Sequence, residues 1–419
     1  MLKYFYLYLV AFVYLGCGFQ EKDISDDLDN PLGDVNTDCG LPALIFKPSV
    51  HYLVPDEEFT APLFLSDSLE SETLYGGFKT TIFFDTGIVD LKDVRSGQFA
   101  ESTRIPGVLA AGGDVVALSD VNAEAMHGAA ALCPEARTYD DAHEMLEKES
   151  LDVLYSIVPA FARTDVEIIA AERGIHLFSE KPQVLDMALG WRIEQAIANG
   201  GVVSTVGVRE RYRPLFQEAK KWLAEKRVVH MRFQSFGGLP GSVHGSWWDE
   251  IDKSGGRALD WGVHATDYLR FMTGLEVVQA QAFYHQPEPY VLPLSSSLHY
   301  AFDSGATALL SFVSSSGKTG SQGMPGGEPW FVIYCEEGVL ALHGYERLVA
   351  DGAVVYEADD YDPWREQDRV FAKAVRVGDA SLLMSDYRDA LYSLGPVLAA
   401  WESSRLGGQC VDVAQFMKV

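Results

Sequence analysis

The sequence has few basic residues for its size. It contains 33 Lys and Arg against 60 Asp and Glu, which gives a net charge of −27 over 419 residues. Because nucleic-acid binding depends on clustered Lys and Arg, this composition excludes a nucleic acid as the expected partner. The same acidity would repel an anionic small molecule unless the binding site carries local positive charge.

Cysteine is also scarce, and none of the five cysteines lies in a CxxC or Cys/His spacing typical of zinc sites. We therefore expect no bound metal and no disulfide framework. Free cysteines behave as small hydrophobic residues, so we expect buried or partly buried thiols. The cysteines are Cys17, Cys39, Cys133, Cys335 and Cys410.

The apolar run from Tyr4 to Leu15 is too short to span a membrane comfortably and is typical of a signal-peptide core. It is followed by Gly16-Cys17, which resembles a lipoprotein cleavage site with Cys17 as the lipidated residue. We interpret residues 1–20 as a signal or lipoprotein segment, which would make the protein exported or lipoprotein-anchored, with any membrane anchoring through this segment. The alternative is an apolar strand in a cytoplasmic protein.

An acidic extension, residues 21–79, shows no strong periodicity, and its structure is left open. From residue 80 to 206, apolar β-branched runs alternate with helical patterns, as in "DVVALSD" (114–120) and "LDVLYSIVP" (151–159). Helices separate the strands, so the pattern predicts a Rossmann-type α/β domain with a doubly wound parallel sheet covered by helices on both faces.

Residues 207–419 show a different pattern. A strand is expected at 228–236, followed by a glycine-rich loop and a helix within 254–274. Several strands then follow without intervening helices, which favours an α+β domain with an open, largely antiparallel sheet. Two helical segments close the chain.

Ligands of doubly wound sheets bind at the carboxyl ends of the strands, where this sequence places several polar residues. Asp120 ends a strand, and a carboxylate there accepts hydrogen bonds from an adenosine ribose. A carboxylate disfavours a 2′-phosphate, so NAD is expected in preference to NADP. The alternative is that Asp120 caps the following helix.

Lys181 and the pair Asp260 and His264 are the candidate catalytic residues. Lys181 precedes Pro182 at a strand end, where its cation can polarise an oxygen, although a surface lysine is the alternative. Asp260 and His264 share a helix face, and a carboxylate beside an imidazole can orient the ring and favour its protonated form. A purely structural pair is the alternative. Asp267, one turn on, is interpreted as a solvated helix residue.

These features together resemble the glucose–fructose oxidoreductase / inositol dehydrogenase / MocA (Gfo/Idh/MocA) family of nicotinamide-dependent oxidoreductases. The resemblance rests on "VVALSDVN" (115–122), "AAERGIHLFSEKP" (170–182), "VGVRERYRP" (206–214) and "SGGRALDWGVHATDYLRFMTG" (254–274), and it extends over residues 88–413. It implies an NAD(P)-dependent dehydrogenase acting on a sugar or polyol, with NAD as cofactor.

The resemblance also implies that the catalytic residues Lys181, Asp260 and His264 meet at the nicotinamide end of the cleft. His264 would accept the hydroxyl proton, and Lys181 would hold the reacting oxygen. Asp260 would either orient His264 or bind a neighbouring hydroxyl of the substrate. The cofactor residues implied are Gly97, Asp120, Asn122, Pro159, Glu180 and Lys181. The substrate residues implied are Arg211, Trp247 and Trp248, and core packing is the alternative for the two tryptophans. Family members associate through the open sheet, so a homo-oligomer is expected.

The sequence lacks the G-x-G-x-x-G loop with which this family opens its first βα unit. In the matching segment, 87–107, Asp90 and Lys92 occupy the first two glycine positions and Gly97 remains. Arg163 also stands where the family often has His, and it could reach a phosphate instead. Two functions therefore stay open: a dehydrogenase with a divergent phosphate loop, and a non-catalytic sugar-binding or structural member without a dinucleotide.

Overall fold

The computed structural model describes residues 78–84, 99–315 and 327–418, with the backbone alone for 78–84. The expected signal segment 1–20, the extension up to residue 77, and Asp90, Lys92 and Gly97 lie outside the described residues. The chain divides into two compact units, and all described residues belong to the second, Leu74–Val419.

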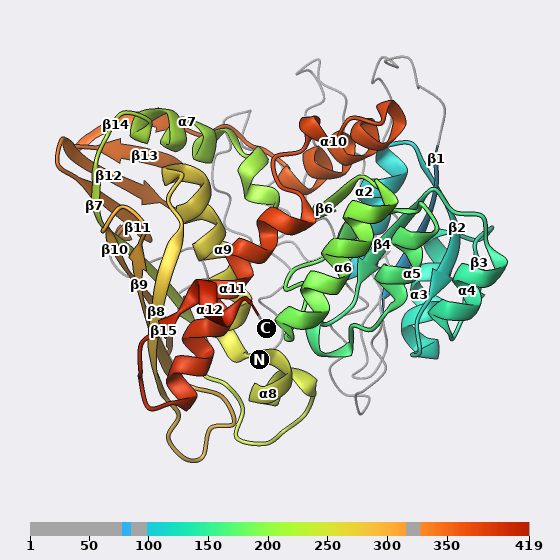
Figure 1. Ribbon diagram of the computed structural model, residues 1–419, viewed down its shortest axis with the longest axis horizontal. Helices are drawn as coiled ribbons and strands as arrows, with labels where there is room; N and C mark the ends of the chain where they lie inside the picture. Colours follow the sequence, from blue (N-terminus) through green and yellow to red (C-terminus); the bar gives the residue numbers. More distant parts are fainter. Residues whose placement is uncertain (1–77, 85–98, 316–326, 419) are drawn as a thin grey trace, which may run out of the picture. The chain divides into compact units, whose positions relative to one another are not determined.

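The first half of this unit forms a six-stranded parallel sheet in the order β3-β2-β1-β4-β5-β6 (Figure 1). Its strands are β1 (Phe78–Phe84), β2 (Gly113–Ser119), β3 (Arg137–Tyr139), β4 (Val153–Ile157), β5 (His176–Ser179) and β6 (Ser204–Val206). The helices between them are α2 (Ile105–Ala110), α3 (Ala123–Leu132), α4 (Ala142–Lys148), α5 (Val166–Glu172) and α6 (Met187–Gly200). A π-helical turn, Ala100–Arg104, leads into α2. The predicted doubly wound sheet is confirmed.

The second half builds a nine-stranded sheet in the order β14-β13-β12-β11-β7-β10-β9-β8-β15. Its strands are β7 (Val228–Gly237), β8 (Val277–His285), β9 (Ser295–Phe302), β10 (Thr307–Ser314), β11 (Phe331–Cys335), β12 (Gly338–His343), β13 (Arg347–Ala350), β14 (Ala353–Glu357) and β15 (Val411–Asp412). Among the described strands of this sheet, β7 and β10 pair in parallel and the other neighbours pair antiparallel. The largely antiparallel sheet is therefore also confirmed.

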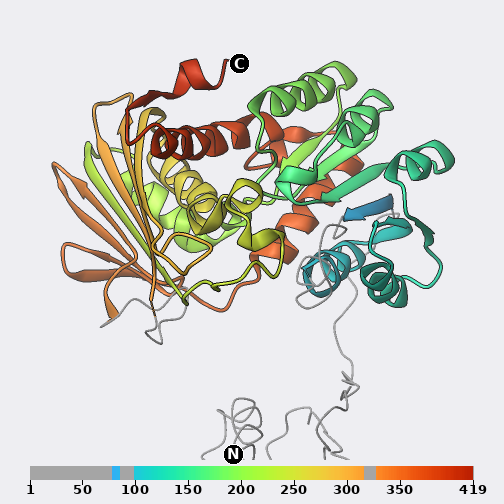
Figure 2. The ribbon, with the colours of Figure 1, turned by 90° about the horizontal axis from the view of Figure 1, so that it is seen from below.

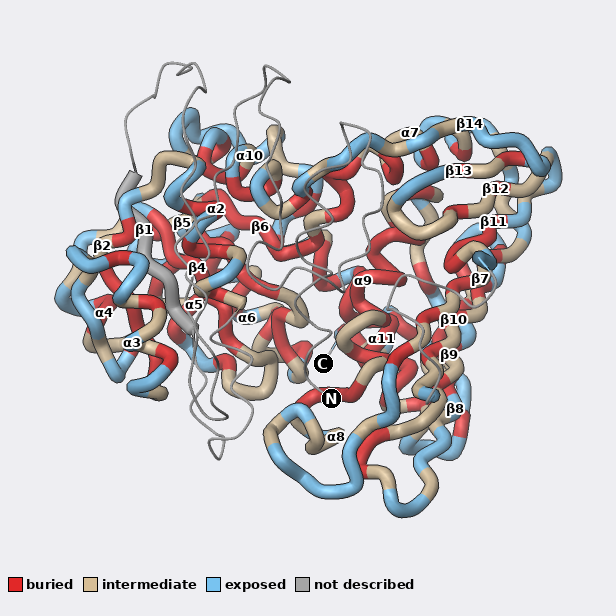
Figure 3. Tube along the Cα trace, turned by 180° about the vertical axis from the view of Figure 1, so that it is seen from behind, coloured by how far each residue is buried: buried red, intermediate tan, exposed pale blue. Residues whose placement is uncertain are grey.

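Helices cover one face of the nine-stranded sheet, and its other face carries no described helix (Figure 2). The helices of this half are α7 (Pro214–Leu223), α8 (Ile251–Ser254), α9 (Gly256–Thr273), α10 (Pro363–Val377), α11 (Tyr387–Arg405) and α12 (Val413–Phe416). Burial alternates along β7 from Met231 onward, as expected for a strand with one packed face. In Figure 3, α9 and α11 are largely buried while the edge strand β14 is exposed.

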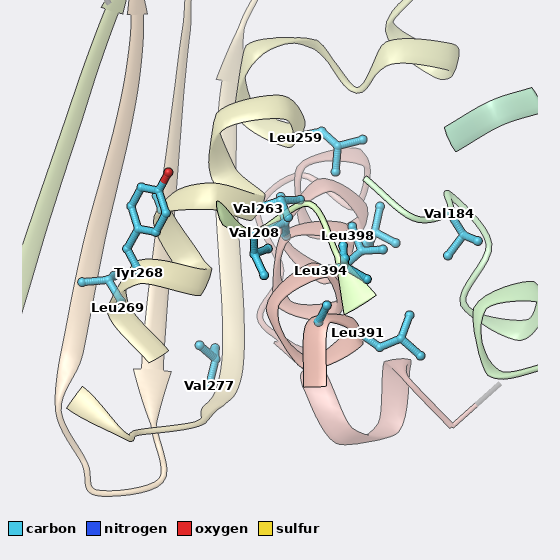
Figure 4. Close-up of a cluster of buried hydrophobic side chains, with 14 of the residues drawn as sticks. Val184, Val208, Leu259, Val263, Tyr268, Leu269, Val277, Leu391, Leu394 and Leu398 are labelled. Carbon is cyan, nitrogen blue, oxygen red and sulfur yellow. The ribbon is translucent and has the colours of Figure 1, made fainter. Parts of the chain in front are cut away.

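A single hydrophobic cluster joins the two sheets (Figure 4). Leu259 and Val263 of α9 and Leu391 of α11 belong to it, and so does Val184, which follows β5. The first half and the second half therefore share a core, and α9 is held between α11 and the nine-stranded sheet. This packing fixes the helix that carries Asp260 and His264.

Helix α10 belongs to the second half in sequence but completes the core of the first. Phe371 and Ala372 of α10 are fully buried in a cluster with Tyr155 of β4 and Phe178 of β5. The rings of Tyr155 and Phe178 stack at a centroid distance of 4.7 Å, and Phe371 meets Phe178 edge-on at 5.4 Å. The parallel sheet is thus covered on this side by a helix that arrives late in the chain.

No helix among the described residues is long and apolar enough to cross a membrane. Within the same residues, no group of His, Cys, Asp or Glu has the arrangement of a metal site. The described cysteines are free thiols, with Cys133 buried, Cys335 half-buried and Cys410 exposed. Cys17 and Cys39 lie outside the described part of the chain.

Candidate active site

Lys181 and Asp260 meet across the two halves of the unit. Lys181 follows the carboxyl end of β5, and its Nζ donates to Oδ1 of Asp260 on α9 at 2.5 Å. The two side chains are 16% and 27% exposed. The alternative of a solvated surface lysine is therefore wrong, because the cation is mostly enclosed and faces a carboxylate.

His264 lies one turn further along α9 and is almost fully buried, at 4% exposure. Its ring packs between Trp261 and Tyr268, at centroid distances of 5.7 and 5.8 Å. Burial, followed by the charges of Lys181 and Arg209, holds the pKa of His264 well below its usual range. The imidazole is therefore neutral near pH 7.

The expectation that Asp260 favours a protonated His264 is wrong. Asp260 binds Lys181, and the groups that act most on the pKa of His264 are two cations. The physical reason is that the first half contributes Lys181, a partner of Asp260 that the sequence of α9 alone does not reveal. Nδ1 of His264 is buried and has no hydrogen-bond partner among the described residues.

Glu180, predicted as a cofactor residue, binds a buried arginine that the sequence did not single out. Nε of Arg104 donates to Oε1 of Glu180 at 2.6 Å, and the guanidinium lies over the ring of Phe178 at 4.4 Å. The other carboxylate oxygen accepts from the backbone N–H of Lys181 at 3.2 Å. These contacts hold the strand end that presents Lys181. No local sequence pattern marks Arg104, since its partners lie far away in the chain.

Arg104 has a second carboxylate partner on α10. Its NH1 donates to Oδ1 of Asp368 at 3.0 Å, and its NH2 donates to the side chain of Gln367 at 3.3 Å. Burial raises the pKa of Asp368 to about 7, with Arg104 lowering it and the nearby Glu180 raising it. Two carboxylates thus share one guanidinium, and one of them is easily protonated.

Arg163 does not reach toward a phosphate, contrary to expectation. Its side chain is 1% exposed and pairs with Glu167 of α5. It also donates to the hydroxyl of Ser179 at 2.6 Å and to the carbonyl of Glu180 at 2.5 Å. Arg163 follows β4, and it lies against the end of β5 because the buried carboxylate of Glu167 pairs with its charge.

Asp267 is fully buried, so its interpretation as a solvated residue is wrong. Its Oδ1 accepts from NH2 of Arg211 at 2.6 Å and from the hydroxyl of Ser393 at 2.9 Å. Arg211 also forms an ion pair with Asp389 at 2.6 Å. These contacts account for Arg211 within the fold, and its role as a substrate residue stays a prediction.

The residues expected near the ribose lie at the carboxyl ends of their strands. Asp120 follows β2 and is 2% exposed, and its Oδ1 accepts from the backbone N–H of Asn122 at 2.7 Å. Asn122 is the residue that caps α3, because its side chain accepts from the N–H groups of Glu124 and Ala125. Pro159 lies two residues beyond Ile157, the last residue of β4, and directly precedes the short helix Ala160–Ala162. Because Asn122 caps α3, the alternative that Asp120 caps this helix is wrong.

The predicted substrate aromatics lie in a short helix, Trp247–Asp249. Trp247 is half-buried and contacts Phe161, which follows β4, at a ring distance of 5.3 Å. Trp248 is 37% exposed and packs edge-on against Trp247 at 5.5 Å. The Phe161–Trp247 contact joins the loop of the second half to the segment that follows β4 of the parallel sheet.

Arg209 is a further cation near His264, and the sequence analysis did not identify it. Arg209 follows β6, its guanidinium lies over the ring of Trp364 at 4.0 Å, and its side chain is 13% exposed. Its Nε lies 3.1 Å from the neighbouring carboxylate of Glu210, which also binds Arg213 at 2.5 Å. The segment "RERY" (209–212) gives no local sign that its first arginine lies near His264.

Two protein-family models match the chain, one in each half. The model of the oxidoreductase family with an NAD-binding Rossmann fold matches residues 87–208, and the model of the Gfo/Idh/MocA C-terminal domain matches residues 216–341. The chain belongs to the Gfo/Idh/MocA oxidoreductase family.

Relatives share parts of the sequence and most of the fold. The chain is 28% identical over 142 residues to scyllo-inositol 2-dehydrogenase (NAD(+)) of Bacillus subtilis, covering 33% of this chain and 40% of that protein. It is 25% identical over 287 residues to D-xylose 1-dehydrogenase (NADP(+)) 2 of Haloferax volcanii, covering 64% and 83%. The match thus spans well under half the length of the Bacillus enzyme. The crystal structure of an oxidoreductase from Thermotoga maritima has a TM-score of 0.67 at 18% identity, covering 81% of this chain and 99% of that one.

Proposed function

We propose that the protein is an NAD-dependent dehydrogenase that transfers a hydride between a hydroxyl-bearing carbon of a sugar or polyol and the nicotinamide. The observation that carries this proposal is the Lys181–Asp260 bond of 2.5 Å, formed on the helix that also presents a buried, neutral His264. The family membership and the dehydrogenase relatives support the same function.

The three side chains suit proton transfer at a substrate hydroxyl. A neutral imidazole accepts a proton, and His264 is neutral because burial and two cations oppose its charge. Lys181 stabilises the negative charge that develops on the substrate oxygen, and Asp260 holds the ammonium in place. NAD⁺, when bound, supplies the hydride acceptor.

The strand ends fit a dinucleotide in two respects. The sheet order β3-β2-β1-β4-β5-β6 places the topological switch point between β1 and β4, where such sheets bind their ligand. Asp120 places a carboxylate at the end of β2, which suits the ribose hydroxyls of NAD and repels the 2′-phosphate of NADP. Asn122, Pro159 and Glu180 are proposed to line the same edge.

The test is a titration of NADH and NADPH into the purified protein, followed by nicotinamide fluorescence. We expect micromolar NADH binding and weaker NADPH binding, reduced in Lys181→Ala but unchanged in Lys221→Ala, whose lysine is 70% exposed on α7. Absence of binding of either dinucleotide to folded protein without retained cofactor would refute the dehydrogenase and leave the non-catalytic sugar-binding member.

Turnover gives a second test. With NAD⁺ and a panel of inositols and aldoses, His264→Gln is expected to lower kcat by about 10²–10⁴-fold while NADH binding stays within about threefold. A His264→Gln variant that turns over at the parental rate would contradict the proposed base.

The uncovered face of the nine-stranded sheet is the proposed surface of self-association. Phe283 of β8 and Tyr334 of β11 lie on it with 54% and 38% exposure. An uncovered sheet face with exposed aromatic side chains suits a contact with a second copy of the chain. Size-exclusion chromatography that gives a monomer at micromolar concentration would refute this association.

A further inference from the structure

The charge balance beside His264 is opposite to that of the chain. The protein as a whole carries −27, yet the groups that depress the pKa of His264 by their charge are both cations, Lys181 and Arg209. Lys181 is neutralised by Asp260 at 2.5 Å. The charge of Arg209 is therefore the one that Asp260 does not balance.

Arg209 is incompletely neutralised by the protein. Its nearest carboxylate, Glu210, is fully buried and is shared with Arg213, whose Nε donates to Oε2 at 2.5 Å. Two guanidinium groups thus share one negative charge. Among the described residues, the terminal nitrogens of Arg209 donate no hydrogen bond, although its side chain is only 13% exposed. Enclosed charges in proteins are normally paired, so this cation lacks part of its complement.

The fold nevertheless holds Arg209 in one place. The ring of Trp364, at the start of α10, lies 4.0 Å from the guanidinium carbon. Stacking of this kind engages the face of the guanidinium and leaves its in-plane N–H donors available. The arginine follows β6 at the carboxyl edge of the parallel sheet, where ligands of this architecture bind. A positioned fork of donors matches the geometry of a carboxylate or phosphate.

We infer that Arg209 is the subsite for an anionic group of the substrate, so that the sugar or polyol carries a carboxylate or a phosphate. This inference rests on the proposed dehydrogenase function, whose cofactor binding is tested separately by the NADH titration. The anion would restore the charge balance beside His264 and would orient the reacting hydroxyl toward it.

The experiment is isothermal titration of the NADH complex with matched sugars: D-glucuronate and D-gluconate, D-glucose 6-phosphate, and the neutral D-glucose and myo-inositol. The anionic ligands are expected to bind at least tenfold more tightly than the neutral ones. The carboxylate and phosphate arms distinguish a sugar acid from a sugar phosphate. Arg209→Gln should weaken the preferred anion by about tenfold to hundredfold and change neutral sugars by less than about twofold.

Two further variants separate the effect of the guanidinium geometry from a general loss of positive charge. Arg209→Lys keeps the charge but loses the fork, so it should retain part of the anion preference. Arg388→Gln removes an equal charge from an exposed site and should leave every affinity unchanged. Neutral sugars binding as tightly as anions, no anionic sugar binding to an intact NADH complex, or an anion preference that survives Arg209→Gln would each overturn the inference.

Discussion

Arg104 and Glu180 form a buried hydrogen bond of 2.6 Å although 76 residues separate them. The bond joins the π-helical turn before α2 to the end of β5, one residue before Lys181. Because the same guanidinium also binds Asp368 of α10, three distant segments are held at one point. The position of Lys181 therefore depends on contacts between segments that are far apart in the chain.

Removal of Arg104 should be strongly destabilising. Arg104→Met would leave Glu180 and Asp368 without their common cation, and breaking a buried pair in this way costs about 3–5 kcal/mol. Urea denaturation would measure the loss in the free energy of unfolding. Arg388→Gln, at a 62% exposed site, should change it by less than about 0.5 kcal/mol. A loss below about 1 kcal/mol in Arg104→Met would contradict the central role of this pair.

His264 should make the protein less stable as the pH falls. Its pKa is depressed in the folded state, so the unfolded chain binds the proton more readily and the stabilisation is complete only above the unfolded pKa, about 6.5. Below that pH we expect its contribution to fall by up to about 1.4 kcal/mol per pH unit.

The measurement is the free energy of unfolding between pH 5 and 7.5 for the parent and for His264→Gln. The variant should show the shallower loss at low pH. His285→Gln, at an exposed position on β8, serves as the matched control and should follow the parent curve. Identical pH profiles for the parent and His264→Gln would show that the imidazole is not held neutral by burial.

Asp120 should set the choice between NADH and NADPH. Asp120→Asn keeps a side-chain oxygen for the N–H of Asn122 but removes the charge that opposes a 2′-phosphate. We expect the ratio of NADPH to NADH affinity to rise on the order of tenfold, or ~1.4 kcal/mol. Asp114→Asn, an exposed residue at the other end of β2, should leave the ratio unchanged. An unchanged ratio in Asp120→Asn would remove Asp120 from the ribose site.

Trp247 should contribute to substrate binding more than to turnover. Its ring contacts Phe161 beside the strand ends, and loss of an aromatic surface weakens contact with a sugar ring. Trp247→Ala should raise KM on the order of tenfold and change kcat by less than about threefold. Trp222→Ala on α7 is the aromatic control, and steady-state kinetics separates the two parameters. A change confined to kcat would assign Trp247 a different role.

The strands and helices were largely predictable because each shows a local pattern of apolar and polar residues. The apolar runs 151–159 and 114–120 became β4 and β2, and the consecutive strands of the second half formed the expected sheet. The short strand β3 (Arg137–Tyr139) and the start of α4 at Ala142 were not predictable in this way. Three residues are too few to show a period.

The partners of charged residues could not be predicted, since they come from distant segments. Asp260 and His264 were found by their spacing on α9, but the partner of Asp260 is Lys181, 79 residues earlier. Asp267 has the local appearance of a solvated residue, and the packing of α11 places it in the core with Arg211. Helical periodicity indicates that a face is buried, but it does not identify the surface that covers it.

The return of α10 to the first sheet makes the dinucleotide-binding half dependent on the end of the chain. A gene fragment that stops near residue 207 would lack Phe371 and Ala372, and it would expose the faces of Tyr155 and Phe178 to water. The same fragment would leave the guanidinium of Arg104 without Asp368. Ribosomal synthesis reaches α10 only after the whole nine-stranded sheet except β15, so the nucleotide-binding half completes its folding late, when nearly the entire polypeptide has been made.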